Sequence, residues 1–201
     1  PLGSLADLRP AFARTQADGT FLDVKDVVDL RLNVSTLRAV TTYLRARDAE
    51  RFPALIKMTE SVELFPDIER EIERIINKYG EVKDTASPQL AEIRRSILSA
   101  QSSISKTLNA ILRQAQASGI VDKEAAPTIR EGRLVIPVSA MNKRKIQGII
   151  HDESATGKTA FGEPTSVGEV INRLRELENE ERREIIRILV EFANLVRPYY
   201  E

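Results

Sequence analysis

Two segments of about thirty residues carry apolar side chains at spacings of three and four, and they constrain the fold more than any other feature. The first runs from Pro88 to about Ser118, and the second from Ser166 to Arg197. Such spacing places the apolar residues on one face of a helix, as in a coiled-coil seam. At ~1.5 Å per residue each helix would be about 45 Å long. The sequence therefore predicts two long helices that pair in opposite directions.

The sequence between the two predicted helices changes to a pattern typical of β-strands. Residues 127–165 contain the β-branched runs "TIREGRLVIPVSA" and "KIQGIIHDE", followed by the short run "KTAFGEP". Polar residues separate these runs, as in the hairpins of small sheets. We therefore predict a mainly α fold: an elongated helical core and lever, with two long antiparallel helices and a small antiparallel β unit at the tip.

The first part of the chain is also predicted to be helical. Asp23 is placed as the N-cap of one helix, Pro53 and Pro66 fall near the first turns of two shorter helices, and Gly80 is the expected end of the second. The opening "PLGS" is interpreted as a remnant of recombinant expression, so the natural protein is expected to begin further upstream. The predicted organisation is an expression remnant (1–4), a helical core (5–86), lever helices (87–126 and 166–201) and a small β clamp-like insert (127–165).

Composition excludes several classes of protein. Thirty basic side chains balance thirty acidic ones among 201 residues, so any nucleic-acid-binding surface must be local. Because cysteine is absent and there is one histidine, disulfides and thiolate metal sites are excluded, and no metal cofactor is expected. No apolar run approaches the roughly 20 residues that cross a bilayer, and there is no secretory signal pattern. We expect a cytoplasmic protein without a membrane partner.

The two predicted long helices also suggest a weak point. If residue 117 faces residue 166, then "SAQSS" (99–103) lies opposite "ENEERRE" (178–184). The first segment is poor in apolar side chains and the second has none, so little burial would hold the helices together there. This pairing predicts a polar, weakly packed waist.

Residues 151–164, "HDESATGKTAFGEP", end like a Walker A phosphate-binding loop. In that motif glycines let backbone amides wrap the phosphates, and a helix follows. Here Asp152 stands at the first glycine position, and Pro164 arrives where the helix should run. The alternative is a hairpin with a turn from Ser154 to Gly157, in which Gly157 takes positive φ. An independent nucleotide-binding enzyme would require Lys158 for ATP binding.

A local basic patch is the strongest candidate for function. Residues 128–162 hold six basic and three acidic side chains, a surplus of three positive charges on a neutral chain. The run "NKRK" at 142–145 is predicted to lie in a turn, where mobile cations can follow a phosphate backbone without reading bases. An ordinary solvated turn is the alternative. The candidate nucleic-acid-binding residues are Arg130, Arg133, Lys143, Arg144, Lys145 and Lys158.

The polar residues around the predicted turn receive a structural interpretation. In a strand His151 and Glu153 would share one face, but two ligands do not make a metal site. Ser154 has no Gly-x-Ser-x-Gly elbow and no second histidine is available, so a serine hydrolase is excluded and no catalytic residue is predicted. His151 is expected to be a hydrogen-bonded strand residue that fixes the turn. The structural turn set is His151, Asp152, Ser154, Gly157, Thr159, Glu163 and Pro164.

The second long helix is rich in arginine but also in glutamate. Pairs such as Glu169 with Arg173 and Glu178 with Arg182 have the favourable i, i+4 order. We therefore predict a self-neutralised, solvated face rather than a nucleic-acid-binding one.

Several motifs in one order resemble a known family. "GRLVIPV", then "GIIHDESATGKTAFGEP", then "INRLRELENEERREIIRIL" are similar to the signature run of the second bacterial subfamily of MutS proteins, here called MutS-II. "GEVKDTASPQLAEIRR" and "LADLRPAFARTQADGTFL" resemble earlier segments of the same family. The resemblance runs from about Leu5 to the C-terminus. Gly162 departs from it, because a large apolar residue is usual at that position.

The resemblance implies the core and lever region of a MutS-like ATPase, with the β element in the place of the DNA-gripping clamp of mismatch-repair proteins. Members of this family are dimeric ATPases that bind branched DNA and restrain recombination, and some act on collided ribosomes. Implied partners are therefore branched DNA or ribosomal RNA, the parent protein's own ATPase domain, and a second copy in a homodimer. ATP and Mg would belong to the parent. For this chain the resemblance implies no cofactor and no catalysis, because the ATPase and small nuclease-like domains are expected to lie beyond it.

Two functions stay open at this stage. The first is a non-catalytic module that contacts branched or mismatched DNA and couples it to the ATPase domain. The alternative is a helical lever of the same family that holds a ribosome or another protein without specific DNA binding. Because phosphate-driven binding falls steeply with salt, a salt titration discriminates between them.

Overall fold

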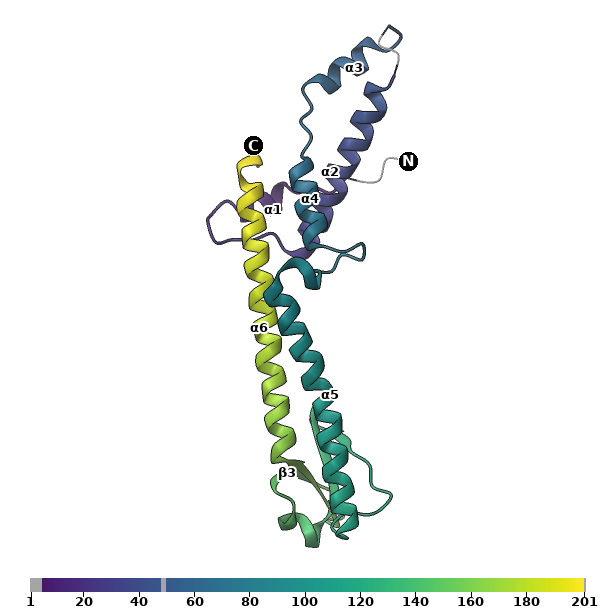
Figure 1. Ribbon diagram of the computed structural model, residues 1–201, viewed down its shortest axis with the longest axis vertical. Helices are drawn as coiled ribbons and strands as arrows, with labels where there is room; N and C mark the ends of the chain where they lie inside the picture. The colour runs from purple at the N-terminus through teal and green to yellow at the C-terminus, as the bar shows by residue number, and fades with distance from the viewer. Residues whose placement is uncertain (1–4, 48–49, 201) are drawn as a thin grey trace. The chain divides into compact units, whose positions relative to one another are not determined.

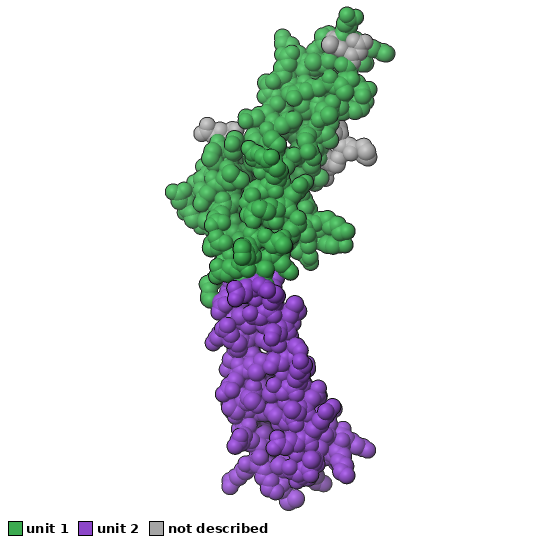
Figure 2. All heavy atoms as spheres, viewed as in Figure 1, with its two compact units in different colours: residues 1–91, 182–201 green, residues 92–181 purple. Residues whose placement is uncertain are grey.

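The computed structural model describes residues 5–47 and 50–200. The chain forms two compact units, coloured separately in Figure 2: unit 1 comprises 1–91 and 182–201, and unit 2 comprises 92–181. The predicted expression remnant "PLGS" lies outside the described residues. Each unit has its own cluster of buried apolar side chains, so the burial that stabilises the chain is divided between two cores.

Two long helices contribute to both units (Figure 1). α5 spans Pro88–Ala117 and α6 spans Thr165–Val196, close to the predicted ends. Pro88 suits the first turn of α5 because the missing N–H has no intrahelical partner there, and Gly119 follows the end of α5 with a φ of 69°. The predicted mainly helical fold with two long paired helices is confirmed. Within the described ranges, no helix is long and apolar enough to span a membrane.

Unit 1 is helical. Asp23 caps α2 as predicted, because its side chain accepts a hydrogen bond of 2.8 Å from the backbone N–H of Asp26. The elements besides the ends of α5 and α6 are α1 (Arg9–Arg14), α2 (Val24–Arg45), α3 (Pro53–Glu60), α4 (Pro66–Ile75) and the 3-10 helices η1 (Asp84–Ala86) and η3 (Arg197–Tyr199). The core of unit 1 includes the fully buried side chains of Leu22, Val27, Ile72, Leu90 and Phe192.

The end of α4 differs from the prediction. The helix ends at Ile75 rather than at Gly80, because Ile76 is extended and forms an isolated antiparallel bridge with Val82. The backbone N–H of Lys83 donates to the carbonyl of Ile75 at 2.8 Å and closes this small loop. Gly80 has a φ of 82° and permits the turn within it. The apolar stripe continues into the extended segment, so periodicity alone placed the helix end too late.

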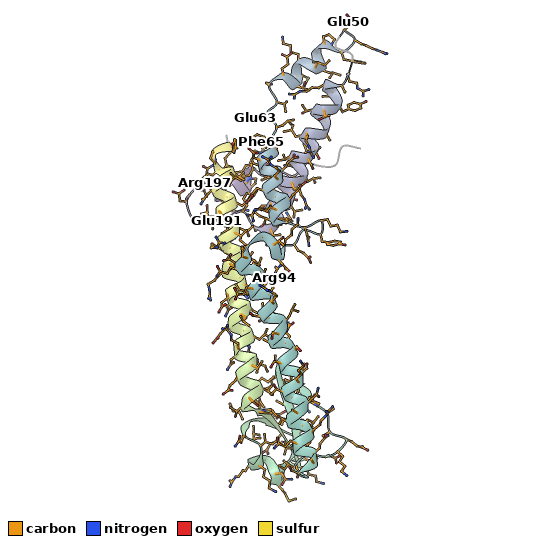
Figure 3. The ribbon with its side chains drawn as sticks, in the orientation of Figure 1. Glu50, Glu63, Phe65, Arg94, Glu191 and Arg197 are labelled. Carbon is orange, nitrogen blue, oxygen red and sulfur yellow. The ribbon has the colours of Figure 1, made fainter. Side chains whose placement is uncertain are left out.

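The C-terminal end of α6 is held within unit 1. Arg197, labelled in Figure 3, donates from Nε to the carbonyl of Thr15 at 3.0 Å and from Nη1 to Oδ1 of Asn194 at 2.7 Å. The ring of Tyr200 stacks on Phe12 with centroids 4.3 Å apart. The contacts with Thr15 and Phe12 fix the last turn of α6 and the residues after it against the N-terminal part of the chain.

Unit 2 contains a four-stranded antiparallel sheet, which lies where α5 ends and α6 begins. The strand order is β1-β2-β4-β3, so β2 and β4 are central. Gly162 of β4 pairs with Ile136 of β2 on one side and with Ile150 of β3 on the other. The predicted antiparallel β unit is thereby confirmed. Its elements are β1 (Thr128–Arg130), β2 (Arg133–Ser139), the 3-10 helix η2 (Ala140–Lys145), β3 (Gly148–Glu153) and β4 (Thr159–Pro164).

One face of this sheet packs against the two long helices. Ile136 and Val138 of β2 are buried and cluster with Leu108 and Leu112 of α5 and with Val167 of α6. Alternate residues of a strand point to the same face, so this pair defines the face toward the helices. The core of unit 2 therefore fixes the sheet to both helices at once.

The two long helices pair in a register that differs from the prediction. Arg94 of α5, labelled in Figure 3, donates from Nε to Oε1 of Glu181 in α6 at 2.7 Å. Residues 99–103 therefore lie beside 169–177 rather than beside 178–184. The predicted waist opposite the apolar-free segment 178–184 is therefore wrong, although both helices line an open cavity of about 450 Å³ beside 99–103. Its lining includes Ser96, Ser99, Ser103, Val170, Arg173 and Leu177.

Candidate functional site on the four-stranded sheet

The face of the sheet opposite the helices carries charged side chains. Arg133 alternates with Ile136 and Val138 along β2, so its side chain lies on the other face. Arg130 of β1 is the register partner of Arg133 and shares that face. Two of the six predicted nucleic-acid-binding residues are therefore neighbours on the sheet.

Arg130 covers an aromatic ring and meets a carboxylate. Its guanidinium carbon lies 4.4 Å from the ring centroid of Phe161, and its Nη1 lies 4.0 Å from Oδ2 of Asp152. Phe161 is only 7% exposed although it lies on the face turned away from the helices. The Arg130 side chain therefore helps to shield an apolar ring in addition to carrying charge.

Glu163 is a buried carboxylate that gathers two basic side chains. Nη1 of Arg133 donates to its Oε2 at 3.0 Å, and Nε2 of His151 lies 2.6 Å from the same oxygen. The side chain of Glu163 is 5% exposed, which leaves these two partners as its main compensation for burial. Arg133 is therefore committed to a contact within the sheet.

His151 reaches Glu163 because β3 has a bulge at this residue. Ile150 pairs with Gly162, and Asp152 pairs with the adjacent residue Phe161. His151 is therefore an extra residue of β3 that has no pairing partner on β4. A bulge re-aims the side chain of the inserted residue. The structure places His151 as a hydrogen-bonded strand residue, as the sequence interpretation had it.

The turn between β3 and β4 closes on Ser154. The backbone N–H of Gly157 donates to the carbonyl of Ser154 at 2.7 Å, and the backbone N–H of Thr159 donates to the Ser154 Oγ at 3.1 Å. Gly157 has a φ of 66°, the positive value expected for it. The hairpin interpretation of Ser154 to Gly157 is confirmed.

The same geometry shows that the Walker A alternative is wrong. Lys158 lies at the end of a tight turn between two antiparallel strands, and Thr159 begins β4 rather than a helix. The next helix, α6, begins at Thr165, directly after Pro164 ends the strand. No loop here can wrap phosphates with successive amides at a helix start, so Lys158 has no role as a Walker lysine.

The run "NKRK" forms most of the 3-10 helix η2 rather than an irregular turn. Three contacts hold η2 in place. The backbone N–H of Ala140 donates to the carbonyl of Lys158 at 2.9 Å, and Nζ of Lys143 lies 2.6 Å from Oε1 of Glu153. Nδ2 of Asn142 donates to the carbonyl of Ile120 at 3.4 Å. These contacts join η2 to the β3–β4 turn, to the end of β3 and to the loop that follows α5.

The six predicted cations thus fall into two groups. Arg130, Arg133 and Lys143 face the carboxylates of Asp152, Glu163 and Glu153. Arg144, Lys145 and Lys158 are exposed and make no ion pair with any described residue. We call these three residues the free cation set. Sequence reasoning missed this division because it depends on the strand register and on the position of η2. It also missed the highly exposed Met141 beside the basic run.

Two arginines of α6, Arg173 and Arg187, form ion pairs with glutamates of the same helix. Arg173 lies 3.3 Å from Glu176 and 3.6 Å from Glu180, and the predicted pairing with Glu169 is not formed. Arg187 pairs with Glu184 and Glu191. The predicted pair of Glu178 with Arg182 is likewise not among the ion pairs of the described residues, so self-pairing is seen for Arg173 and Arg187 and stays a prediction for the rest of the face. No group of three potential metal-ligating side chains occurs within the described part of the chain.

These features define a class of protein: a pair of long helices that carries a small antiparallel sheet, with a set of exposed, unpaired cations beside the turn of that sheet. Its relatives are bacterial. The chain is 38% identical over 196 residues to Endonuclease MutS2 of Symbiobacterium thermophilum, covering 98% of this chain and 24% of that protein. It is 34% identical to Endonuclease MutS2 of a Geobacillus species over all of this chain and 26% of that protein. Endonuclease MutS2 of Pelotomaculum thermopropionicum is 37% identical over 95% of this chain and 24% of its own length.

The chain is therefore homologous to one segment of the bacterial MutS2 proteins, as its motifs predicted. It spans about a quarter of the length of the relatives it matches. No family model matches the chain.

Proposed function

We propose that this chain is a nucleic-acid-contacting, non-catalytic segment of a MutS2-type protein. The observation that carries the proposal is the free cation set: Arg144, Lys145 and Lys158 are exposed and unpaired within the described residues, on a chain with no net charge. Unpaired cations on a held loop suit phosphate oxygens, which lie at regular spacing along a nucleic acid and require no base recognition. The proposed ligand is DNA, with branched DNA preferred because the sequence motifs resemble a family that binds it.

The other partners are proposed for the parent protein. ATP and Mg would be bound by a separate ATPase domain, and the parent would be a homodimer. We propose that α5 and α6 couple contact at the sheet to that ATPase domain, which is consistent with their continuous helical hydrogen bonding from the sheet onward.

Binding of a fluorescent three-way DNA junction and of a linear duplex of equal length tests the proposal. Three phosphate contacts predict that log K falls with log salt at a slope of about −3 between about 50 and 200 mM salt. The triple variant Arg144→Ala, Lys145→Ala, Lys158→Ala should weaken binding about tenfold or more at low salt and bring the slope near zero.

A matched variant controls for the loss of three charges. Arg175, Arg182 and Arg183 are exposed on α6, and changing all three to Ala removes the same charge from a different element. This control should leave affinity and slope nearly unchanged. Equal effects of the two triple variants would reject the free cation set as the contact surface. Tighter binding of an RNA junction of the same sequence would favour ribosomal RNA over DNA.

A further inference from the structure

The 3-10 helix η2 presents its side chains on three edges. Residues three apart in a 3-10 helix eclipse each other, so each edge of η2 (Ala140–Lys145) contains one pair of residues. The pairs are Ala140 with Lys143, Met141 with Arg144, and Asn142 with Lys145.

Two of these edges face the rest of unit 2. Lys143 meets Glu153 at 2.6 Å on the first edge. On another edge, Asn142 donates to the carbonyl of Ile120, and Lys145 lines a cavity that Ile120 also lines. The main chain of η2 is also tied to the β3–β4 turn through the Ala140 N–H. The helix is therefore held from two sides, which fixes the direction of its third edge.

The third edge points into solvent. Met141 is 91% exposed, more than any other large apolar side chain among the described residues. Arg144 is also exposed and makes no ion pair with the described residues. Among the described residues, the Met141 side chain therefore buries little apolar surface, and the unpaired guanidinium of Arg144 lies one turn further on. Methionine is favoured at binding surfaces because its unbranched, polarisable side chain adapts to an irregular apolar partner.

We infer that Met141 is a wedge that packs against the face of an unstacked base at a branch point, while Arg144 binds the neighbouring phosphate. This inference rests on the proposed function, and it adds a mechanism by which the chain distinguishes branched DNA from linear DNA. Methionine is one of the apolar side chains that proteins insert at opened base steps. A continuous duplex keeps its bases stacked, whereas a branch exposes a base face at lower cost. DNA and RNA junctions both present a phosphodiester beside an exposed base. The experiment therefore compares a DNA junction with an RNA junction of the same sequence.

The experiment uses the full chain and a three-way DNA junction with 2-aminopurine at the branch point, because the fluorescence of this base rises when it unstacks. The wild-type chain should raise the fluorescence and bind the junction about tenfold more tightly than a linear duplex. Met141→Ala should abolish the rise and the preference while binding to linear DNA is kept. Arg144→Ala should weaken binding to both DNAs.

Two further variants make the result specific. Met141→Leu retains an apolar wedge and should retain the fluorescence rise. Ile129→Ala removes another exposed apolar side chain, 69% exposed on β1, and should change nothing. Both positions are solvent-exposed, so unchanged melting temperatures are expected. An RNA junction of the same sequence carries 2-aminopurine at the same position and should give a smaller rise.

The outcomes separate the inference from the proposed function. A fluorescence rise that survives Met141→Ala, with junction binding intact, overturns the wedge and leaves the cationic surface standing. Absence of binding to either DNA by the wild-type chain overturns both. A larger rise with the RNA junction assigns the wedge to RNA and overturns its assignment to DNA.

Discussion

Glu163 is the single residue on which the polar contacts of the sheet converge. Its carboxylate is buried beside the start of α6, and Arg133 of β2 and His151 of β3 reach it from the two neighbouring strands. The ideal Cβ of Gly168 in α6 would lie 3.2 Å from the other carboxylate oxygen, so the first turn of α6 also closes over it. One side chain thus connects three strands and a helix.

Replacing this carboxylate should destabilise unit 2. Glu163→Gln keeps the shape but leaves Arg133 and His151 without an ionised acceptor, so the free energy of unfolding should fall by about 1–3 kcal/mol. Glu153→Gln is the control, because Glu153 and its partner Lys143 are each more than 40% exposed. That pair should contribute less than about 1 kcal/mol. Urea denaturation followed by circular dichroism measures both variants, and equal losses would contradict a special role for the buried carboxylate.

Gly148 is required for a different reason. A Cβ at Gly148 would lie 2.1 Å from the carbonyl oxygen of Glu163, and a backbone atom cannot move aside as a flexible side chain can. Gly148→Ala should therefore lower the free energy of unfolding by about 2–3 kcal/mol.

Gly162 provides the matched control for this prediction. A Cβ there would meet only the side chains of Ile150 at 3.4 Å and Ile146 at 3.7 Å, which is ordinary packing distance. Gly162→Ala should change stability by less than about 1 kcal/mol. Thermal melts of the two variants compare them, and a larger loss for Gly162→Ala would contradict the backbone clash. Gly162 stands where relatives are expected to have a large apolar residue. The side chains of Ile146 and Ile150 fill the space beside it.

At the residue scale, what could be predicted from the sequence was local. The turn from Ser154 to Gly157 depends only on residues next to each other in the sequence, so it could be predicted from the local sequence. The pairing of Arg130 with Asp152, and of Arg133 with Glu163, depends on strand register and on the bulge at His151. A cross-strand shift of one residue turns every side chain to the other face, so these pairs could not be read before the register was known.

At the scale of elements, the helices were predictable and their pairing was not. Long apolar periodicity, with proline or glycine near the helix ends, defined α5 and α6 closely. The predicted register was wrong because residue 117 was assumed to face residue 166. A whole sheet joins these helices, so their ends need not be opposite. Contacts such as Arg94 with Glu181 set the pairing instead.

The cavity between α5 and α6 gives a testable weak point. Ser103 lines it, whereas the adjacent Ser102 is exposed. Ser103→Leu should fill part of the space and raise the free energy of unfolding by about 1–2 kcal/mol. Ser102→Leu gives the same gain in helix propensity but does not fill the cavity. It should raise the free energy of unfolding by only about 0.3 kcal/mol.

Hydrogen exchange checks the same cavity in the unaltered chain. Amides of α5 from residue 96 to residue 103 should exchange faster than those near Leu108 and Leu112, which pack in the core of unit 2. Ser103→Leu should slow exchange in the first segment. Equal protection along α5 before the substitution would contradict a loosely packed waist.

For the whole molecule, we expect the free energy of unfolding to depend on pH through buried carboxylates. Glu184 is 4% exposed in unit 1, where Ser87 Oγ donates to its Oε1 at 2.7 Å and Arg187 donates to both of its oxygens. The hydrogen bonds from Arg187, followed by that from Ser87, hold the pKa of Glu184 below its ordinary value despite the opposing effect of burial.

The sign of the acid effect follows from that lowered pKa. A carboxyl group with a lower pKa in the folded state stabilises the fold above its unfolded pKa, and this contribution is lost as pH falls below about 4 toward the folded value. Glu184→Gln should therefore be less stable than the wild type at neutral pH, and the difference should shrink as the pH falls to about 3. Denaturant titrations at neutral and acidic pH measure it. A difference that stays constant with pH would contradict the ionic origin.

The order β1-β2-β4-β3 leaves two strand edges of the sheet unpaired within the described chain. A second copy of the chain can add a strand at an unpaired edge. The chain has equal numbers of acidic and basic residues, so net charge does not repel one copy from another. β1 offers only three residues, and the extra residue at His151 bends β3 out of the flat geometry that such an addition needs. We therefore expect the bulge that directs His151 to Glu163 also to disfavour fibre-like self-association through the β3 edge.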